Sequence, residues 1–108
     1  MDQTNLVFPQ GNDIVVTARY PEISDGTGQT ASFYYKPSRY TDDSDPSVVA
    51  YESAVTPDPD TPGQTLSVFH VPGEQNEVPG TYWWRIDVSD SLNNTRTANC
   101  GPVLVEAV

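Results

Sequence analysis

Ten prolines divide this chain of 108 residues into short segments. They stand at positions 9, 21, 37, 46, 57, 59, 62, 72, 79 and 102. Proline removes a backbone donor and clashes with the preceding turn, so each one interrupts a helix interior. The longest proline-free window, residues 80–101, is rich in Thr, Tyr, Trp, Ile and Val, which favour strands. The spacing argues against a helical bundle and a doubly wound α/β fold, and it predicts an all-β chain.

Seven strands are expected, separated by segments rich in Asn, Asp, Gly and Pro. They are predicted at residues 4–8, 13–20, 30–36, 47–55, 64–71, 80–89 and 95–106, the last interrupted near Gly101 and Pro102. No break in composition and no internal repeat divides the chain, so we expect one domain over residues 1–108. Residues 56–63 hold three prolines, which predicts a stiff, extended connector outside any sheet interior.

The segment 80–89 gives the clearest alternation of side chains between two faces. Successive strand residues point to opposite sides, and the apolar ones here fall on one parity, opposite Trp83 and Arg85. The predicted core comprises Tyr82, Trp84, Ile86 and Val88 from this strand, with Ile14, Val16 and Phe33 from two others.

The entry to this strand, Val78 to Trp84, is similar to the start of the sixth strand of an immunoglobulin-like sandwich. There a tyrosine two residues before an inward site bonds back to the preceding backbone. Tyr82 has that place here and Trp84 the inward site, which is a cysteine in antibody domains; alternatively, Tyr82 is one more aromatic on a pleated face. We expect an immunoglobulin-like antiparallel β-sandwich of about seven strands. Since Cys100 is the single cysteine, it has no intrachain disulfide.

Charge separates several classes of partner. Five Lys and Arg against fifteen Asp and Glu leave a net charge of −10, which opposes binding to nucleic acid and to anionic membranes. No apolar run approaches the roughly 20 residues of a membrane-spanning helix. The first residues lack the basic and apolar regions of a secretory signal, and a lone cysteine suits a reducing compartment. We therefore expect synthesis in a cytoplasm, with the final location left open.

The sequence offers few residues for catalysis. His70, Cys100 and Lys36 are each the only residue of their type. No Gly-x-Ser-x-Gly motif and no Cys–His zinc spacing occur. A glycosidase-type pair of carboxylates is the remaining catalytic alternative. We expect that this chain is not an enzyme and that it binds no cofactor.

Acidic loops leave calcium as a minor alternative to solvated surface charge. The candidate ligands are Asp42, Asp43 and Asp45 in one loop and Asp58 and Asp60 in another, with Asp87 and Asp90 as a further pair. Carboxylate oxygens suit a hard cation, although the spacing of an EF-hand loop is absent.

The last third of the chain carries a resemblance to a known group of proteins. Residues 79–90, 94–97 and 101–105 form a Gly-x-Tyr strand and a return strand that finishes close to the C-terminus. This hairpin resembles that of small immunoglobulin-like proteins of tailed-bacteriophage virions, of the capsid-decoration and baseplate-attachment types. The resemblance implies location in a virion, and it implies as partners the major capsid protein, other virion proteins or further copies of this chain.

These observations favour a non-enzymatic virion structural protein that decorates and stabilises the outer surface of a capsid. The candidate interface residues are Trp83, Phe69 and Tyr34, together with Pro57, Pro59 and Pro62 of the connector, because aromatic side chains dominate interface hot spots. One alternative is a tail, tail-tip or baseplate component. Another is a carbohydrate- or receptor-binding sandwich that stacks sugars on Trp83 and on Tyr40 or Tyr51.

Overall fold

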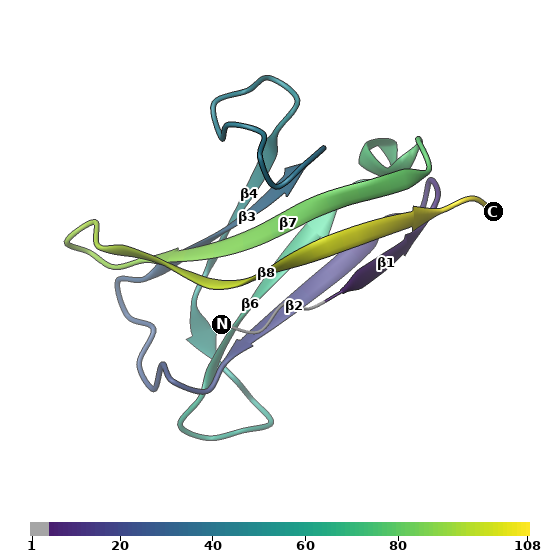
Figure 1. Cartoon of the computed structure of the whole chain (residues 1–108). Coiled ribbons are helices and arrows are strands. Elements are labelled where there is room, and N and C mark those ends of the chain that lie inside the picture. The colour runs from purple at the N-terminus through teal and green to yellow at the C-terminus, as the bar shows by residue number, and fades with distance from the viewer. Residues whose placement is uncertain (1–4) are drawn as a thin grey trace.

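The computed structural model describes residues 5–108, and strands dominate it (Figure 1). The elements are β1 (Leu6–Pro9), β2 (Ile14–Tyr20), β3 (Thr30–Lys36), β4 (Val49–Ala54), β5 (Thr56–Pro57), β6 (Thr65–Val71), the 3₁₀ helix η1 (Gly73–Asn76), β7 (Gly80–Ser89) and β8 (Thr95–Glu106). The prediction of an all-β chain is confirmed, since the described residues form no α-helix. No helix in this part of the chain is long and apolar enough to cross a membrane.

The strands form two sheets. One has five strands in the order β1-β8-β7-β3-β4, and the other has three in the order β2-β6-β5. Figure 1 shows β2 and β6 behind β7 and β8, as two layers. All pairings are antiparallel except that of β1, which runs parallel to β8. The short turn after Pro9 therefore takes the chain from the edge of one sheet to the edge of the other.

Most predicted strand limits agree with the structure. The bounds of β3, β7 and β8 are those expected. β2 and β6 each begin one residue later, β4 is shorter at both ends by one or two residues, and β1 ends one residue later, at Pro9. The predicted start of the first strand at residue 4 lies outside the described residues.

The segment 56–63 stays outside any sheet interior, as expected, but the prediction that it is an extended connector is wrong. Thr56 and Pro57 form β5 at the edge of the three-stranded sheet, where a proline removes no interior ladder bond. The chain then closes into a turn, because the Asp58 amide donates to the Gln64 carbonyl oxygen at 3.0 Å. The Asp60 amide also donates to Asp58 Oδ1 at 2.9 Å. Pro59 and Pro62 thus belong to a folded loop.

The expected interruption of the last strand at Gly101 and Pro102 is also wrong. β8 is continuous through Pro102, which pairs with Trp83. The irregularity lies nearer the start of β8, where Ile86 pairs with Asn99 but Asp87 pairs with Thr97. Ala98 is the extra residue of this bulge. The described pairing of β1 with β8 starts beyond Pro102, at Val103.

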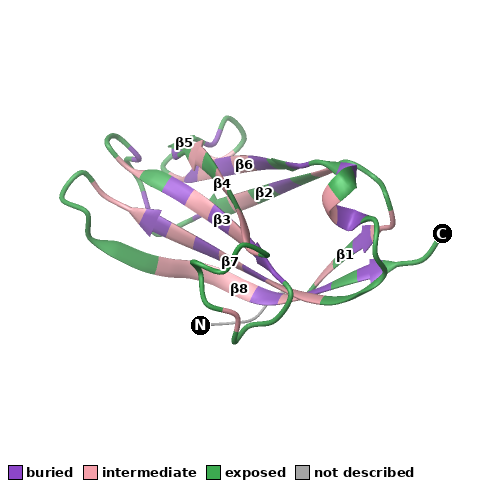
Figure 2. Cartoon of the chain, turned by 90° about the horizontal axis from the view of Figure 1, so that it is seen from above, coloured by how far each residue is buried: buried purple, intermediate pink, exposed green. Residues whose placement is uncertain are grey.

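The core lies between the sheets, and buried residues alternate with more exposed ones along the strands (Figure 2). Phe33 stacks on Trp84 with ring centroids 5.9 Å apart and contacts Phe69 at 5.5 Å. The predicted core residues Val16, Phe33, Trp84, Ile86 and Val88 are buried, as expected. Ile14 and Tyr82 are half-buried and pack against this cluster.

The prediction that Phe69 is an interface residue is wrong, because only 1% of its surface is exposed. The inward parity of β6 also carries Thr65 and Ser67, while Leu66 and Val68 lie on the outer side. The two hydroxyls are satisfied by backbone: Thr65 donates to the Ile23 carbonyl oxygen at 3.0 Å and Ser67 to that of Ala54 at 3.1 Å. Polar residues on the inner side therefore conceal the parity of this strand in the sequence.

Tyr82 makes the backbone bond expected of it. Its hydroxyl donates to the Val78 carbonyl oxygen at 2.7 Å, and its ring meets that of Tyr35 edge to face at 5.4 Å. The bond ties the segment before β7 to the strand that follows.

The helix η1 fastens the turn between β1 and β2. The Gly73 amide donates to Asp13 Oδ1 at 2.6 Å. The buried Asn76 side chain accepts from the Tyr35 hydroxyl at 2.9 Å and donates to the Asn12 carbonyl oxygen at 3.1 Å. A Cβ at position 73 would overlap the carbonyl oxygen of Gly11, so only glycine fits there.

Candidate interaction face

The outward side of the five-stranded sheet, which we call the outer face, carries the predicted interface residues Trp83 and Tyr34 among charged side chains. Alternation along β3 and β7 turns Tyr34, Lys36, Trp83 and Arg85 to this side, away from the core. The loop 37–48 between β3 and β4, which projects from the sheet in Figure 1, contributes further side chains.

Ion pairs hold the loop to the sheet. The Asp43 carboxylate pairs with Lys36 and accepts two bonds from Arg85, Nη2 to Oδ2 at 2.7 Å and Nη1 to Oδ1 at 3.3 Å. Lys36, although on the outward side, is buried beneath the loop and donates to the Thr41 carbonyl oxygen at 2.7 Å. Hydrogen bonds from Arg85 and then Lys36 hold the pKa of Asp43 below its usual range. Asp43 thus anchors the loop.

Arg85 also connects the two long strands. Its Nε donates to Asp87 Oδ1 at 3.0 Å, and the same oxygen accepts from the Thr97 hydroxyl of β8 at 2.9 Å. Its guanidinium carbon lies 4.5 Å from the centre of the Tyr34 ring. The Arg85 guanidinium is therefore occupied twice: its charge pairs with carboxylates, and its carbon lies over the Tyr34 ring.

A second arginine stacks on aromatic rings without such engagement. The guanidinium carbon of Arg39 lies 4.9 Å from the centre of the Trp83 ring and 5.5 Å from that of Tyr40. Tyr40 is 86% exposed and Trp83 half-buried. We call these three residues the Arg39 cluster.

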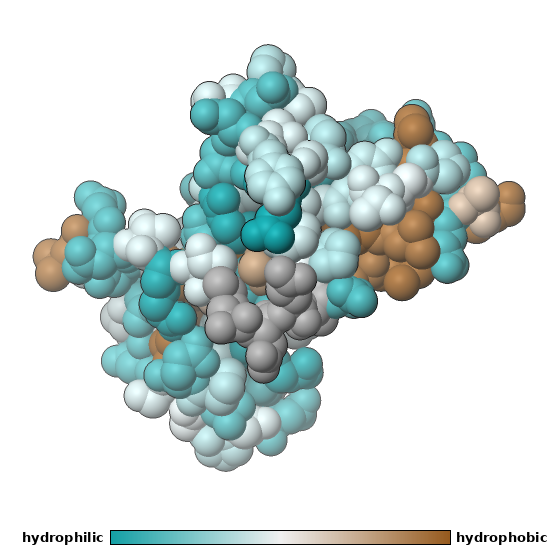
Figure 3. All heavy atoms as spheres, viewed as in Figure 1, coloured by the Kyte–Doolittle hydropathy of each residue, from teal (hydrophilic) through white to brown (hydrophobic). Residues whose placement is uncertain are grey.

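Apolar side chains continue the outer face beyond the Arg39 cluster. Val7 of β1 and Leu104 of β8 are register partners with 55% and 43% of their surfaces exposed. Pro102 lies on the same side of β8 as Leu104 and pairs with Trp83. Val7, Pro102 and Leu104 form an apolar strip, and Figure 3 shows hydrophobic residues gathered over the ends of β1 and β8.

The structure brings together only some of the predicted interface residues. Trp83 and Tyr34 lie on the outer face, as expected of side chains opposite the core parity. Pro57, Pro59 and Pro62 are exposed but lie at the edge of the other sheet, Pro57 in β5 and the other two in the loop that follows. Tyr51, a suggested sugar platform, is half-buried and packs against the core.

The acidic loop 41–48 uses its carboxylates to shape its own backbone. Asp42 Oδ1 accepts from the Ser44 amide and hydroxyl at 2.9 and 2.8 Å. Asp45 Oδ1 accepts from the Ser47 amide and hydroxyl at 2.9 and 2.7 Å. These bonds lower the pKa values of both carboxyl groups. The suggested calcium ligands of this loop therefore serve as turn-forming groups.

The second suggested calcium site, at Asp58 and Asp60, differs from the first because one of its carboxylates is buried. The Asp58 side chain is fully buried, with Oδ1 bonded to the Asp60 amide and Oδ2 in an ion pair 3.5 Å from Arg19 Nε. Residues 5–108 contain no group of three or more His, Cys, Asp or Glu placed to hold a metal ion. The predicted acidic loops do not converge on one site.

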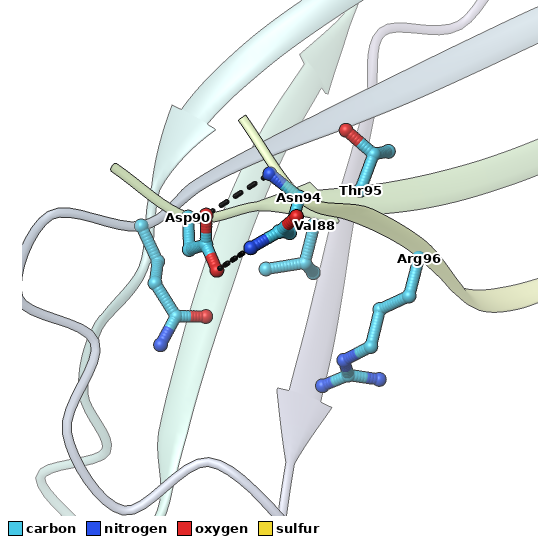
Figure 4. A pocket seen from close by; sticks show the side chains of 6 residues that line it. Val88, Asp90, Asn94, Thr95 and Arg96 are labelled. Carbon is cyan, nitrogen blue, oxygen red and sulfur yellow. Dashed lines mark hydrogen bonds between the residues drawn. The ribbon is translucent and has the colours of Figure 1, made fainter. Parts of the chain in front are cut away.

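A polar hollow lies beside the β7–β8 hairpin (Figure 4). Its lining residues are Gln29, Val88, Asp90, Asn94, Thr95 and Arg96. Asp90 accepts from the Asn94 amide at 3.0 Å and from its side-chain nitrogen at 3.3 Å. Arg96 pairs with Glu22 at 3.0 Å. The bonds between Asp90 and Asn94 stabilise the hairpin turn, and Arg96 is paired with a residue outside the hollow.

The residues with nucleophilic or general-base chemistry lie apart. His70 is exposed on β6 of the three-stranded sheet, paired in register with Val15. Cys100 is half-buried on β8 of the five-stranded sheet, where it pairs in register with Arg85. The two side chains therefore cannot act together.

Sequence reasoning placed Arg85 on the outward side of β7 by parity, but it named neither Arg85 nor Arg39 as an interface residue. Nothing in the sequence places Arg39 against Trp83, which lies more than forty positions away. Comparison with protein-family models, with curated proteins and with solved structures found no match to this chain.

Proposed function

We propose that this chain is a non-enzymatic virion structural protein that decorates and stabilises a phage capsid, docking through its outer face. The observation that carries the proposal is the gathering on one sheet face of the Arg39 cluster and the apolar strip. Arginine and aromatic residues are enriched in the cores of protein interfaces, and a few of them supply most of the binding energy.

An immunoglobulin-like sandwich is the proposed fold type. Three features support it: the packing of two sheets, the bond from the Tyr82 hydroxyl to the Val78 carbonyl oxygen, and the burial of Trp84 two residues later. A tyrosine at this place, bonded to upstream backbone, is typical of such domains. In this arrangement the outer face is turned away from the core, and we assign docking to it.

The virion role is supported by the resemblance of residues 79–105 to small phage virion proteins. The partner would be the major capsid protein, another virion protein or a further copy of this chain. The net charge of −10 suits an outward position on the head, away from packaged DNA, and keeps unassembled copies soluble. Apolar and aromatic side chains of the outer face then supply the contact.

A carbohydrate-binding role receives less support from the geometry. A sugar would stack on Trp83 or Tyr40, and the Arg39 guanidinium competes with it for both rings. A tail or baseplate position uses the same outer face, so it is separated from capsid decoration by experiment.

The test is to add the purified chain to expanded heads assembled without it and to measure cosedimentation and the melting temperature of the heads. Binding with a raised melting temperature is expected. Recovery of the chain on tails freed from heads, with no binding to heads, would overturn the decoration role.

A matched pair of variants assigns the docking face. Leu104→Ser removes an exposed apolar side chain from the outer face, and Val15→Ser removes one from the opposite sheet. We expect the first to weaken binding to heads and the second to leave it unchanged. Equal losses from both changes would contradict docking through the outer face.

A further inference from the structure

Arg39 differs from the other basic residues in its electrostatic partners. The other four pair with carboxylates of the chain: Arg19 with Asp58, Lys36 and Arg85 with Asp43, and Arg96 with Glu22. Within residues 5–108, Arg39 forms no ion pair, although the chain carries fifteen acidic residues. Its charge is held in place by aromatic rings alone.

The aromatic contacts of Arg39 leave the hydrogen-bond donors of its guanidinium available to a partner. A guanidinium is planar, and its N–H groups point outward in that plane. The guanidinium carbon of Arg39 lies over the Trp83 and Tyr40 rings, and these cation–π contacts give the charge no carboxylate acceptor. The fork that binds a carboxylate through two parallel bonds therefore stays open.

The neighbouring acidic side chains are already occupied. Asp42 Oδ1 is bonded to Ser44, and Asp43 bridges Lys36 and Arg85. These bonds fix the carboxylates within the loop and keep them from neutralising Arg39. The loop thus carries one cation, Arg39, that none of its own carboxylates pairs with.

We infer that the Arg39 cluster is a seat for an Asp or Glu side chain of a partner protein. The inference rests on the proposed docking function and names the chemistry of the partner. A single carboxylate fits one open fork, whereas a polyanion would be repelled by the net charge of −10. The apolar strip beside Trp83 favours apolar residues next to that carboxylate, since excluded water strengthens the pair.

A peptide titration tests the seat without the partner. The probes are acetyl-Leu-Glu-Leu-amide and its Gln counterpart, followed through the Arg39 Nε–H and Trp83 indole N–H resonances. The Glu peptide should bind about tenfold more tightly than the Gln peptide, as expected for a charge-assisted bond. Equal shifts from both peptides, or from inorganic phosphate and the Glu peptide, would overturn the inference.

Variants locate the response. Arg39→Gln should abolish the preference for the Glu peptide, and Arg39→Lys should retain little of it, because lysine lacks the stacked fork. Arg96→Gln is the matched control, since Arg96 is an exposed arginine paired with Glu22. A preference that survives Arg39→Gln would contradict the assignment.

The two proposals fail in different ways. If the wild-type chain binds heads and Arg39→Gln binds equally well, the carboxylate seat is wrong and capsid decoration stands. If the Glu peptide titrates through Arg39 but the wild-type chain does not bind heads, the seat stands and the decoration role is wrong.

Discussion

The ammonium group of Lys36 lies buried beneath the loop that follows it and forms an ion pair with Asp43 seven residues later. Only 5% of the lysine side chain is exposed, against 45% of the aspartate. The charge of the sheet residue therefore depends on the loop for its compensation, and the loop depends on that charge for its position.

Asp43→Asn should destabilise the fold more than Lys36→Met. The first change leaves a buried ammonium without its carboxylate, while the second leaves Asp43 paired with Arg85. Removing one partner of a buried pair costs about 3–5 kcal/mol, and the exposure of Asp43 reduces this to about 1–3 kcal/mol. Urea unfolding of both variants, with Glu52→Gln as a surface control, measures the difference. The reverse order would show that the lysine is stabilised by the Thr41 carbonyl alone.

Stability should decrease in acid. Hydrogen bonds lower the pKa values of Asp25, Asp42, Asp43, Asp45 and Asp90 in the folded chain. The unfolded carboxyl groups, with pKa near 3.9, then bind protons more readily than the folded ones. Stabilisation is complete above about pH 5 and is lost as the pH falls through 4 toward the folded pKa values.

Thermal melts between about pH 6 and pH 2.5 check this dependence. Protonation also relieves repulsion among the negative charges, which raises stability in acid. The sign of the change in melting temperature with pH therefore shows which effect is larger. A melting temperature that rises on acidification would contradict the dominance of the turn carboxylates. Asp45→Asn should flatten the dependence of melting temperature on pH relative to the wild type.

The two adjacent tryptophans should respond differently to truncation. Trp84 is 2% exposed and stacks on Phe33, so Trp84→Ala should cost about 3–5 kcal/mol of unfolding free energy. Trp83→Ala removes a half-buried outer-face ring and should cost less than about 1 kcal/mol, while weakening attachment to heads. Chemical denaturation of the isolated variants measures both values. Equal destabilisation would contradict the facing of β7.

Tyr82→Phe should lower the unfolding free energy by about 0.5–1.5 kcal/mol. The change deletes only the hydroxyl that donates to the Val78 carbonyl oxygen at 2.7 Å. Tyr51→Phe is the matched control, because Tyr51 is also half-buried against the core. A loss confined to Tyr82→Phe is expected in guanidinium melts, and identical curves for the two variants would remove any special role for this bond.

Strong local alternation explains which parts of the fold could be predicted from the sequence. In β7 every second residue from Trp84 to Val88 is apolar, so period and burial agree. In β6 they disagree, because the inward hydroxyls of Thr65 and Ser67 are satisfied by distant carbonyl oxygens. Those partners depend on the tertiary structure, and the burial of Phe69 could not be inferred without them.

The candidate site was only half predictable for the same reason. Trp83 could be placed on the outer side by parity, since that property is local to one strand. Its contact with Arg39 requires the loop 37–48 to fold over the sheet, which the buried pair of Lys36 and Asp43 brings about. The bulge at Ala98 has a similar origin, because it reflects the pairing of two strands.

The turns closed by Asp42 and Asp45 make aspartate and glutamate non-equivalent in this chain. Each carboxylate reaches an amide only two residues ahead, a span that the additional methylene of glutamate would misplace. Asp→Glu at either position would preserve the net charge while removing a turn bond from the loop that carries Arg39. The charge of this loop and its shape are therefore separable, because the first depends on the carboxylate and the second on the length of the side chain that bears it.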